Sequence, residues 1–226
     1  MNLKRHQKLL VWVCLAALVL WAFAPLRFLL LPVIYFNTYV HELSHALATL
    51  VSGGIVEYVH IYGNGSGLTL SMGGSPVLLA TSGYVGSAIV GGMLVYFSRT
   101  EEGAKRMLWI AAAFIGVGLL LFVRGSVIGV VAGISWALAL VAGAALLEDD
   151  AAVFAAQFLG VQQCLTSVYA FIALVTISAN DLGHSDAKNM EAVTHVPALF
   201  WSLIWMLMGL AAIGIGLRAS WKNEPY

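Results

Sequence analysis

The pentapeptide His41-Glu42-Leu43-Ser44-His45 is the part of the chain whose residue types and spacing could carry out chemistry. On a helix, residues four apart lie on one face, so His41 and His45 can both direct an imidazole nitrogen at one metal ion. Glu42 is not needed as a ligand, and it can take a proton from a metal-bound water. The pattern therefore predicts a zinc (Zn2+) centre in which a carboxylate activates water.

The residues around the pentapeptide are mostly apolar, from 31 to 40 and from 46 to 51. Ionisable side chains in such a membrane-like helix are costly, and they usually mark function. The alternative is a chance match in an ordinary helix. That interpretation is the weaker one, because the chain has only six His and eleven acidic residues.

The composition is that of a membrane protein. Hydrophobic residues make up 61% of the chain and charged residues 10%. These proportions predict an integral protein of the lipid bilayer. The long apolar segments predict an all-α, multi-pass fold, and we expect the protein in the cell (inner) membrane. The net charge is zero, and the sequence has no basic patch that would predict binding to nucleic acid. Cys14 and Cys164 both fall in apolar runs and predict neither a disulfide framework nor a cysteine zinc site.

Six to seven transmembrane helices are expected within one membrane domain, 1–226. The candidate spans are residues 9–24, 26–51, 76–97, 107–123, 126–147, 151–177 and 195–217. The first span resembles a signal peptide, but Pro25 and another apolar segment follow directly, which favours an uncleaved anchor. Lys4, Arg5 and Lys8 favour a cytoplasmic N-terminus. Seven crossings would then put the metal nearer the cytoplasmic half of the membrane. They would also put the charged loop 98–106 outside, although its three basic residues favour the cytoplasm.

Residues 52–75 change character and predict a β-hairpin. Residues 55–62 are rich in β-branched and aromatic side chains, 64–67 have turn chemistry, and 68–72 alternate in polarity. A plain connecting loop is the alternative. In a membrane protein such a hairpin must lie at the interface or be covered by protein. Its edge could accept an extended substrate segment as an added strand.

Two further patterns concern contacts between helices. Gly83, Ser87 and Gly91 recur every four residues and predict a ridge for close helix packing. Three glutamines, Gln157, Gln162 and Gln163, lie inside the span 151–177. They are expected either to bond between helices or to line a polar cavity.

The order of these pieces resembles a known family. The His-Glu-Leu-Ser-His motif is followed by Gly53-Gly54, a Gly-Ser-Gly-Leu-Thr hairpin and Gly83-Tyr84-Val85-Gly86. This order resembles the M50 (site-2 protease) family, and most of all its M50B-like branch. Ser185-Asp186-Ala187, before a late span with Trp201 and Trp205, is also similar to that branch. The resemblance implies a zinc-dependent peptidase that cleaves membrane-spanning substrates.

The third zinc ligand is the open point. A catalytic zinc usually has three protein ligands and a water. Site-2 proteases take an Asp from an Asn-Pro-Asp-Gly or Leu-Asp-Gly motif, which this sequence lacks. Asp186 and Asp181 are the candidates here, ahead of Asp149 and Asp150, and the Ser-Asp-Ala resemblance favours Asp186. Asp186 could instead be the N-cap of a helix that starts at Ala187.

Taken together, the sequence predicts an intramembrane zinc metalloprotease whose partner is the transmembrane segment of a substrate protein. Glu42 would activate the zinc-bound water and later protonate the leaving amine. One alternative is a non-catalytic zinc-binding scaffold or chaperone, which would not require Glu42. A transporter is another alternative, although nothing specifies a substrate path. If no carboxylate completes the site, His60 and His184 are the next ligands to consider. Nothing in the sequence specifies an oligomeric state.

Overall fold

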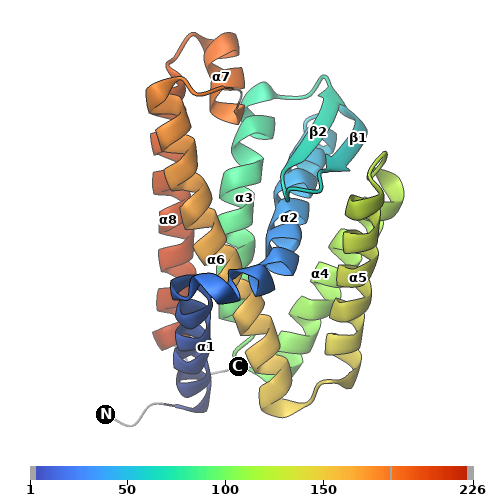
Figure 1. The fold of residues 1–226 in the computed structure, drawn as a ribbon, viewed down its shortest axis with the longest axis vertical. Coiled ribbons are helices and arrows are strands. Elements are labelled where there is room, and N and C mark those ends of the chain that lie inside the picture. Colours follow the sequence, from blue (N-terminus) through green and yellow to red (C-terminus); the bar gives the residue numbers. More distant parts are fainter. Residues whose placement is uncertain (1–3, 184, 223–226) are drawn as a thin grey trace.

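The structure is a computed structural model that describes residues 4–183 and 185–222 (Figure 1). Its elements are α1 (Arg5–Ala22), the 3-10 helix η1 (Ala24–Leu30), α2 (Leu31–Val51), β1 (Ile55–Ile61), β2 (Gly67–Met72), α3 (Pro76–Phe97), α4 (Glu101–Leu121), α5 (Val127–Leu146), α6 (Asp149–Asn180), α7 (Asp186–Thr194) and α8 (Ala198–Lys222). Among the described helices, α1, α3, α4, α5, α6 and α8 are long and apolar enough to cross a membrane. The predicted all-α membrane fold, with a β-hairpin after the motif helix, is confirmed.

The motif helix α2 is not among these six helices. In Figure 1, α1 rises from the lower end of the bundle only part of the way, η1 turns sideways, and α2 continues to the upper end. Together they cross the bundle once, whereas the sequence predicted two separate spans, at 9–24 and 26–51. The physical reason is proline. Pro25 and Pro32 stand at the first or second position of η1 and α2, where a helix can begin but cannot continue from the preceding turn.

Helix α4 begins at Glu101, whereas the sequence predicted a charged loop up to residue 106. Thr100 caps the helix, because its side chain accepts a hydrogen bond from the Gly103 N–H at 3.1 Å. Lys105 then pairs with Glu101 at 2.7 Å, one turn away. Such i,i+4 pairs stabilise a helix. The charged segment is therefore mainly the start of a helix, and a sequence analysis based on hydropathy places that start too late.

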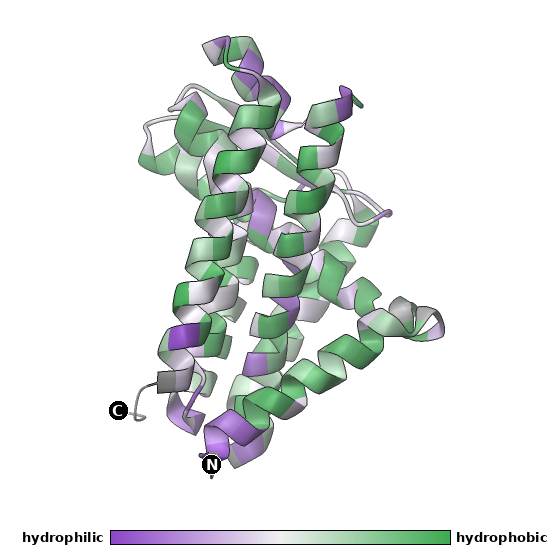
Figure 2. Ribbon diagram, turned by 90° about the vertical axis from the view of Figure 1, so that its left-hand side faces the viewer, coloured by the Kyte–Doolittle hydropathy of each residue, from purple (hydrophilic) through white to green (hydrophobic). Residues whose placement is uncertain are grey.

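The single crossing made by α1, η1 and α2 decides which segments share an end of the bundle. Arg5 Nε lies 2.6 Å from Asp150 Oδ1, and Gln7 Nε2 donates to the Trp221 carbonyl at 2.9 Å. The start of α1 therefore lies beside the start of α6 and the end of α8. The α3–α4 connection is at this lower end too, while the hairpin and α7 are at the upper end (Figure 1). Figure 2 shows apolar residues along most of the helices, and hydrophilic ones near both ends and at a few places inside the bundle.

The hairpin has an inner and an outer strand. β1 and β2 are antiparallel, with Val59 opposite Thr69. The other edge of β1 is occupied, since the Val59 N–H donates to the Phe122 carbonyl at 2.8 Å and the Val59 carbonyl accepts from the Arg124 N–H at 3.0 Å. In an antiparallel pair, two residues opposite each other either both direct their N–H and C=O groups inward or both direct them outward. Because Val59 directs its N–H and C=O away from β2, Thr69 directs its own away from β1. β2 therefore has the outward-facing edge.

Helix α3 packs against α2, α6 and α8. A Cβ added at Gly91 would lie 2.8 Å from Cys164 Sγ, and one at Gly160 would lie 2.8 Å from the Leu94 Cβ. These distances are shorter than real Cβ contacts allow, so the glycines let α3 and α6 approach closely. The predicted ridge of small residues is confirmed at Gly91.

Candidate metal centre

Helix α2 presents both motif histidines to one point. The Nε2 atoms of His41 and His45 are 3.1 Å apart, as expected for residues one turn apart on a helix. The Nδ1 atom of His45 lies 2.6 Å from the Leu79 carbonyl oxygen on α3. A carbonyl can only accept, so Nδ1 is the protonated nitrogen, and the Nε2 lone pair is left for a metal. Such support from a backbone carbonyl is common for metal-binding histidines.

Asp186 of α7 completes the group. Its Oδ2 atom lies 3.6 Å from His41 Nε2 and 3.4 Å from His45 Nε2. In a tetrahedral site with zinc–ligand distances of 2.0–2.1 Å, two ligand atoms are about 3.3 Å apart. The three separations of 3.1, 3.4 and 3.6 Å fit one face of such a tetrahedron. The fourth corner is then available to a water or a substrate oxygen.

The alternative role for Asp186, as a helix cap, is wrong. Ser185 is the N-cap of α7, and its side chain accepts from the Lys188 N–H at 3.3 Å. Asp186 is the first residue of the helix and turns its carboxylate to the histidines. Burial alone would raise the pKa of Asp186, but His45 and His41 in their protonated forms bring that pKa well below its usual value. The carboxylate is thus held in the charged form that binds a metal.

The other candidate ligands lie elsewhere. Asp181 ends α6, with a side chain that is 76% exposed and pairs with Lys188 Nζ at 2.7 Å. Asp150 pairs with Arg5 at the opposite end of the bundle. The ring of His60 in β1 packs against the ring of Tyr62, just after the strand, with 4.5 Å between ring centroids. His184 and the side chain of Asp149 are outside the described residues. Within 4–183 and 185–222, the metal-ligand group found is His41, His45 and Asp186.

Glu42 is buried, with 5% of its surface exposed, and the hairpin holds it. The Thr69 hydroxyl donates to Glu42 Oε2 at 2.7 Å. A Cβ on Gly67 would lie 2.6 Å from Glu42 Oε1, so glycine at this position of β2 leaves room for the carboxylate. The general base predicted from the motif is therefore fixed by the outer strand of the hairpin.

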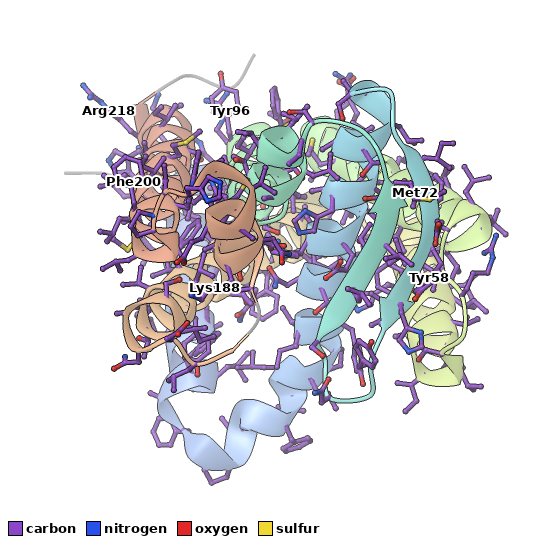
Figure 3. All side chains as sticks on the ribbon, turned by 90° about the horizontal axis from the view of Figure 1, so that it is seen from above. Tyr58, Met72, Tyr96, Lys188, Phe200 and Arg218 are labelled. Carbon is purple, nitrogen blue, oxygen red and sulfur yellow. The ribbon has the colours of Figure 1, made fainter. Side chains whose placement is uncertain are left out.

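A cavity of about 690 Å³ contains these groups. Its walls come from α2, β2, α3, α6 and α7, and they include His41, Glu42, His45 and Asp186. Seen from above, the hairpin with Tyr58 and Met72 lies on one side of the centre and α7 with Lys188 on the other (Figure 3). The cavity thus places a metal-binding group, a carboxylate and a strand edge around one space.

Three further residues shape the site, and the sequence analysis gave them no role in it. Asn37 lines the cavity one turn before His41, and its Oδ1 accepts from Gln163 Nε2 at 2.8 Å. Tyr84 packs edge-on against the His41 ring, with 4.7 Å between centroids. Asn37 was detectable, since it extends the i,i+4 row of the histidines. Gln163 does bond between helices, which is one of the two predicted roles for the glutamines.

Gly83 explains why α3 can pass so close to the motif. A Cβ at this position would lie 2.6 Å from His41 Nε2 and 2.6 Å from His45 Cε1. Any larger residue would displace the two imidazoles. The first member of the predicted small-residue ridge therefore serves the metal centre as well as helix packing.

A bundle of membrane-spanning helices around a His-His-Asp group and a buried glutamate defines the class of membrane metallopeptidases. The comparison with protein families agrees, because the Peptidase M50B-like family matches residues 10–216. The chain therefore belongs to the Peptidase M50B-like family, which confirms the resemblance seen in the sequence. No curated protein and no solved structure matches the chain.

Proposed function

We propose that this protein is a zinc-dependent intramembrane endopeptidase of the cell (inner) membrane, which hydrolyses peptide bonds in the membrane-spanning segments of other proteins. The observation that carries the proposal is the buried carboxylate of Glu42 in the wall of the cavity that contains His41, His45 and Asp186. Membership of a peptidase family supports it, since M50 peptidases are in general zinc metalloproteases. A purely structural metal site would have no use for a general base in this position.

The roles of the side chains follow from their atoms. His41 Nε2, His45 Nε2 and Asp186 Oδ2 would hold the zinc ion. When bound, zinc supplies a Lewis acid that polarises the substrate carbonyl and lowers the pKa of a bound water. Glu42 takes a proton from the attacking water and delivers it to the amine nitrogen as the C–N bond breaks. Thr69 keeps the Glu42 carboxylate oriented through both steps.

The substrate must be extended where it is cut, because a helical peptide bond is shielded by its own hydrogen bonds and side chains. The outer edge of β2 offers the pairing partner for such a segment. Gly67, Leu68, Thr69 and Ser71 line the cavity, and the backbone groups of Thr69 face away from β1. A strand added at this edge would run past Glu42.

Asn37 is placed to bind a substrate oxygen. Its Oδ1 is engaged by Gln163 Nε2, so its amide NH₂ group is the part left to donate into the cavity. A neutral donor beside the metal would assist in holding the carbonyl oxygen as negative charge develops on it.

Glu42→Gln tests the proposal. The purified protein is assayed for zinc content and for cleavage of a transmembrane test substrate, beside the wild type. The variant should keep its zinc and lose cleavage by about 10²–10⁴-fold, the usual contribution of a general base. Glu102→Gln, at an exposed glutamate in the first turn of α4, is the matched control and should cleave normally. Undiminished cleavage by Glu42→Gln would refute the mechanism, and a wild type that binds zinc without cleaving would favour a non-catalytic scaffold.

A further inference from the structure

The basic residues are divided very unequally between the two ends of the bundle. Arg124 and Lys188 lie at the upper end, beside the hairpin and in α7, and Arg27 lies in η1. The other eight of the eleven lie at or near the lower end: Lys4, Arg5, Lys8, Arg99, Lys105, Arg106, Arg218 and Lys222. The seven-crossing topology expected from sequence would have split this group between two sides. The observed fold gathers it on one.

This asymmetry determines an orientation. Cytoplasmic loops of membrane proteins are enriched in Lys and Arg close to the ends of the spans, whereas Asp and Glu contribute little. The lower-end basic residues lie on the first turns of α1 and α4, the connection before α4, and the last turns of α8. The rule therefore assigns the lower end, with the start of α1, to the cytoplasm.

The metal centre lies nearer the other end. Gly83, which touches both histidines, is seven residues from Pro76 at the upper end of α3 and fourteen from Phe97 at its lower end. At a rise of 1.5 Å per residue these separations are about 10 Å and about 20 Å. The third ligand, Asp186, stands on α7, which is not one of the candidate spans.

The cavity also opens toward the upper end. Among its lining residues are Ser66 and Ser71 of the hairpin region and Ser185 and Asn189 of the α7 region. Ser66 and Asn189 are exposed, and Ser71 and Ser185 are half-buried. Both segments lie outside the candidate spans. In Figure 1, α7 is at the upper end of the bundle and the hairpin lies beside the upper part of α2 and α3.

We propose that the metal centre faces the extracytoplasmic side of the membrane, and that its substrate is a membrane-anchored polypeptide whose scissile bond lies in the outer third of the bilayer. The substrate part rests on the proposed peptidase function. The substrate segment unwinds where it meets β2 and Glu42. Water adds across the C–N bond, with OH to the carbonyl carbon and H to the amine. The outer fragment then leaves on the extracytoplasmic side.

Cysteine labelling tests the orientation without requiring any activity. In full-length protein with Cys14→Ala and Cys164→Ala, single cysteines are introduced as Leu182→Cys at the upper end and Glu102→Cys at the lower end. Leu182 is exposed and the Glu102 side chain is 84% exposed, so both are open to reagent. A membrane-impermeant maleimide should label Leu182→Cys in intact bacterial cells, and Glu102→Cys only after lysis. The reverse pattern, or equal labelling of both in intact cells, would overturn the proposal.

A pair of substrates tests the substrate class. One apolar span carries a helix-breaking Gly-Pro pair in its outer third, and its twin carries the same pair in the inner third. The outer-third substrate should be cut about tenfold faster or more, because unpaired backbone cannot cross the hydrocarbon to reach the centre without a large cost. Equal or preferred cutting of the inner-third twin would overturn the assignment. If zinc-loaded protein labels as expected but cuts neither substrate, the peptidase function fails while the orientation stands.

Discussion

The Thr69 hydroxyl donates to Glu42 Oε2 at 2.7 Å and also reaches the Glu42 carbonyl oxygen at 3.0 Å. One side chain thus connects the outer strand of the hairpin to the residue proposed as the general base. A substrate strand paired with β2 would therefore lie next to the residue that orients the water-activating carboxylate. The hairpin and the metal-binding helix α2 are linked by this contact.

Replacing Thr69 tests this connection. Thr69→Val keeps the shape of the side chain and removes the donor, so Glu42 loses a hydrogen bond to a charged oxygen. Such bonds contribute about 1.5–3 kcal/mol, and we expect kcat to fall by about 10- to 100-fold. Zinc content should not change, because Thr69 is not a ligand. Thr69→Ser, which keeps the hydroxyl, should retain most of the activity, and a Val variant as fast as the Ser variant would contradict the role.

The close approach of α3 to the histidines gives a second prediction. Gly83→Ala adds a Cβ that would lie 2.6 Å from His41 Nε2, and we expect the imidazoles to be displaced and zinc affinity to fall steeply. Gly116→Ala on α4 is the control, since nothing lies within 4 Å of its added Cβ. A competition titration of zinc against a chelator measures both variants. Equal, tight binding would show that α3 can move aside at no cost to the metal site.

Strand addition is tested by proline at the outer edge of β2. Val59 and Leu70 are unsuitable positions, because the Val59 N–H donates to the Phe122 carbonyl and Leu70 is paired with Tyr58. Successive residues of a strand direct their backbone groups to opposite edges. Because the backbone groups of Leu70 face β1, the N–H of Ser71 faces the open edge. Ser71→Pro should slow substrate cleavage several-fold and leave zinc content and thermal stability nearly unchanged, because proline is tolerated on edge strands.

Ser71→Ala is the matched control, because it removes the same hydroxyl and keeps the N–H. Turnover of membrane substrates should then be close to that of the wild type. If Ser71→Pro also turns over substrates normally, the hairpin serves only to connect α2 with α3 and to hold Glu42.

Local patterns were sufficient to predict the parts of the site that are contiguous in sequence. The i,i+4 spacing places His41 and His45, and the turn chemistry after Gly63 gives the hairpin, because both depend on neighbours in the chain. The topology of the helices was harder to predict from sequence. Hydropathy alone makes residues 26–51 look like a separate span, whereas the prolines at its start turn it into the second half of one crossing. Under the orientation proposed above, that one difference also changes the side of the membrane on which the metal centre lies.

Contacts between distant segments could not be derived in this way. Asp186 reaches the histidines only because α6 and α8 position α7 above α3. The sequence could narrow the choice of third ligand to a few acidic residues, but it could not show which of them lies near the histidines. The role of Tyr84 was equally hidden from the sequence, since its contact with His41 depends on the packing of α3 against α2. Asn37 was within reach of sequence analysis, because its spacing from His41 repeats the spacing of the motif.

The third ligand can be tested by two matched variants. Asp186→Ala removes an oxygen that lies 3.4 Å from His45 Nε2 and 3.6 Å from His41 Nε2, so zinc affinity should fall steeply. Asp181→Ala removes the exposed partner of Lys188 and should leave zinc binding nearly unchanged. Chelator titration of the two variants reads the difference directly. Equal, tight zinc binding by both would exclude Asp186 as a ligand.

The hydrogen bond between Asn37 and Gln163 yields a prediction about substrate binding in the transition state. Gln163 is fully buried, and its Nε2 holds Asn37 Oδ1 at 2.8 Å, which fixes the direction of the Asn37 amide. Asn37→Ala should therefore lower kcat while zinc content is unchanged, by about 10²-fold if the loss resembles that of an oxyanion donor. Gln163→Leu should lower kcat less, because Asn37 is still present but less well oriented.

The double variant separates positioning from general destabilisation. If Gln163 acts only through Asn37, then adding Gln163→Leu to Asn37→Ala should cause no further loss of kcat, so the two effects are not additive. Zinc content and melting temperature are measured on all four proteins. Fully additive losses of kcat, or a loss of zinc in either single variant, would show that these residues support the packing of α2 against α6 and have no specific role toward the substrate.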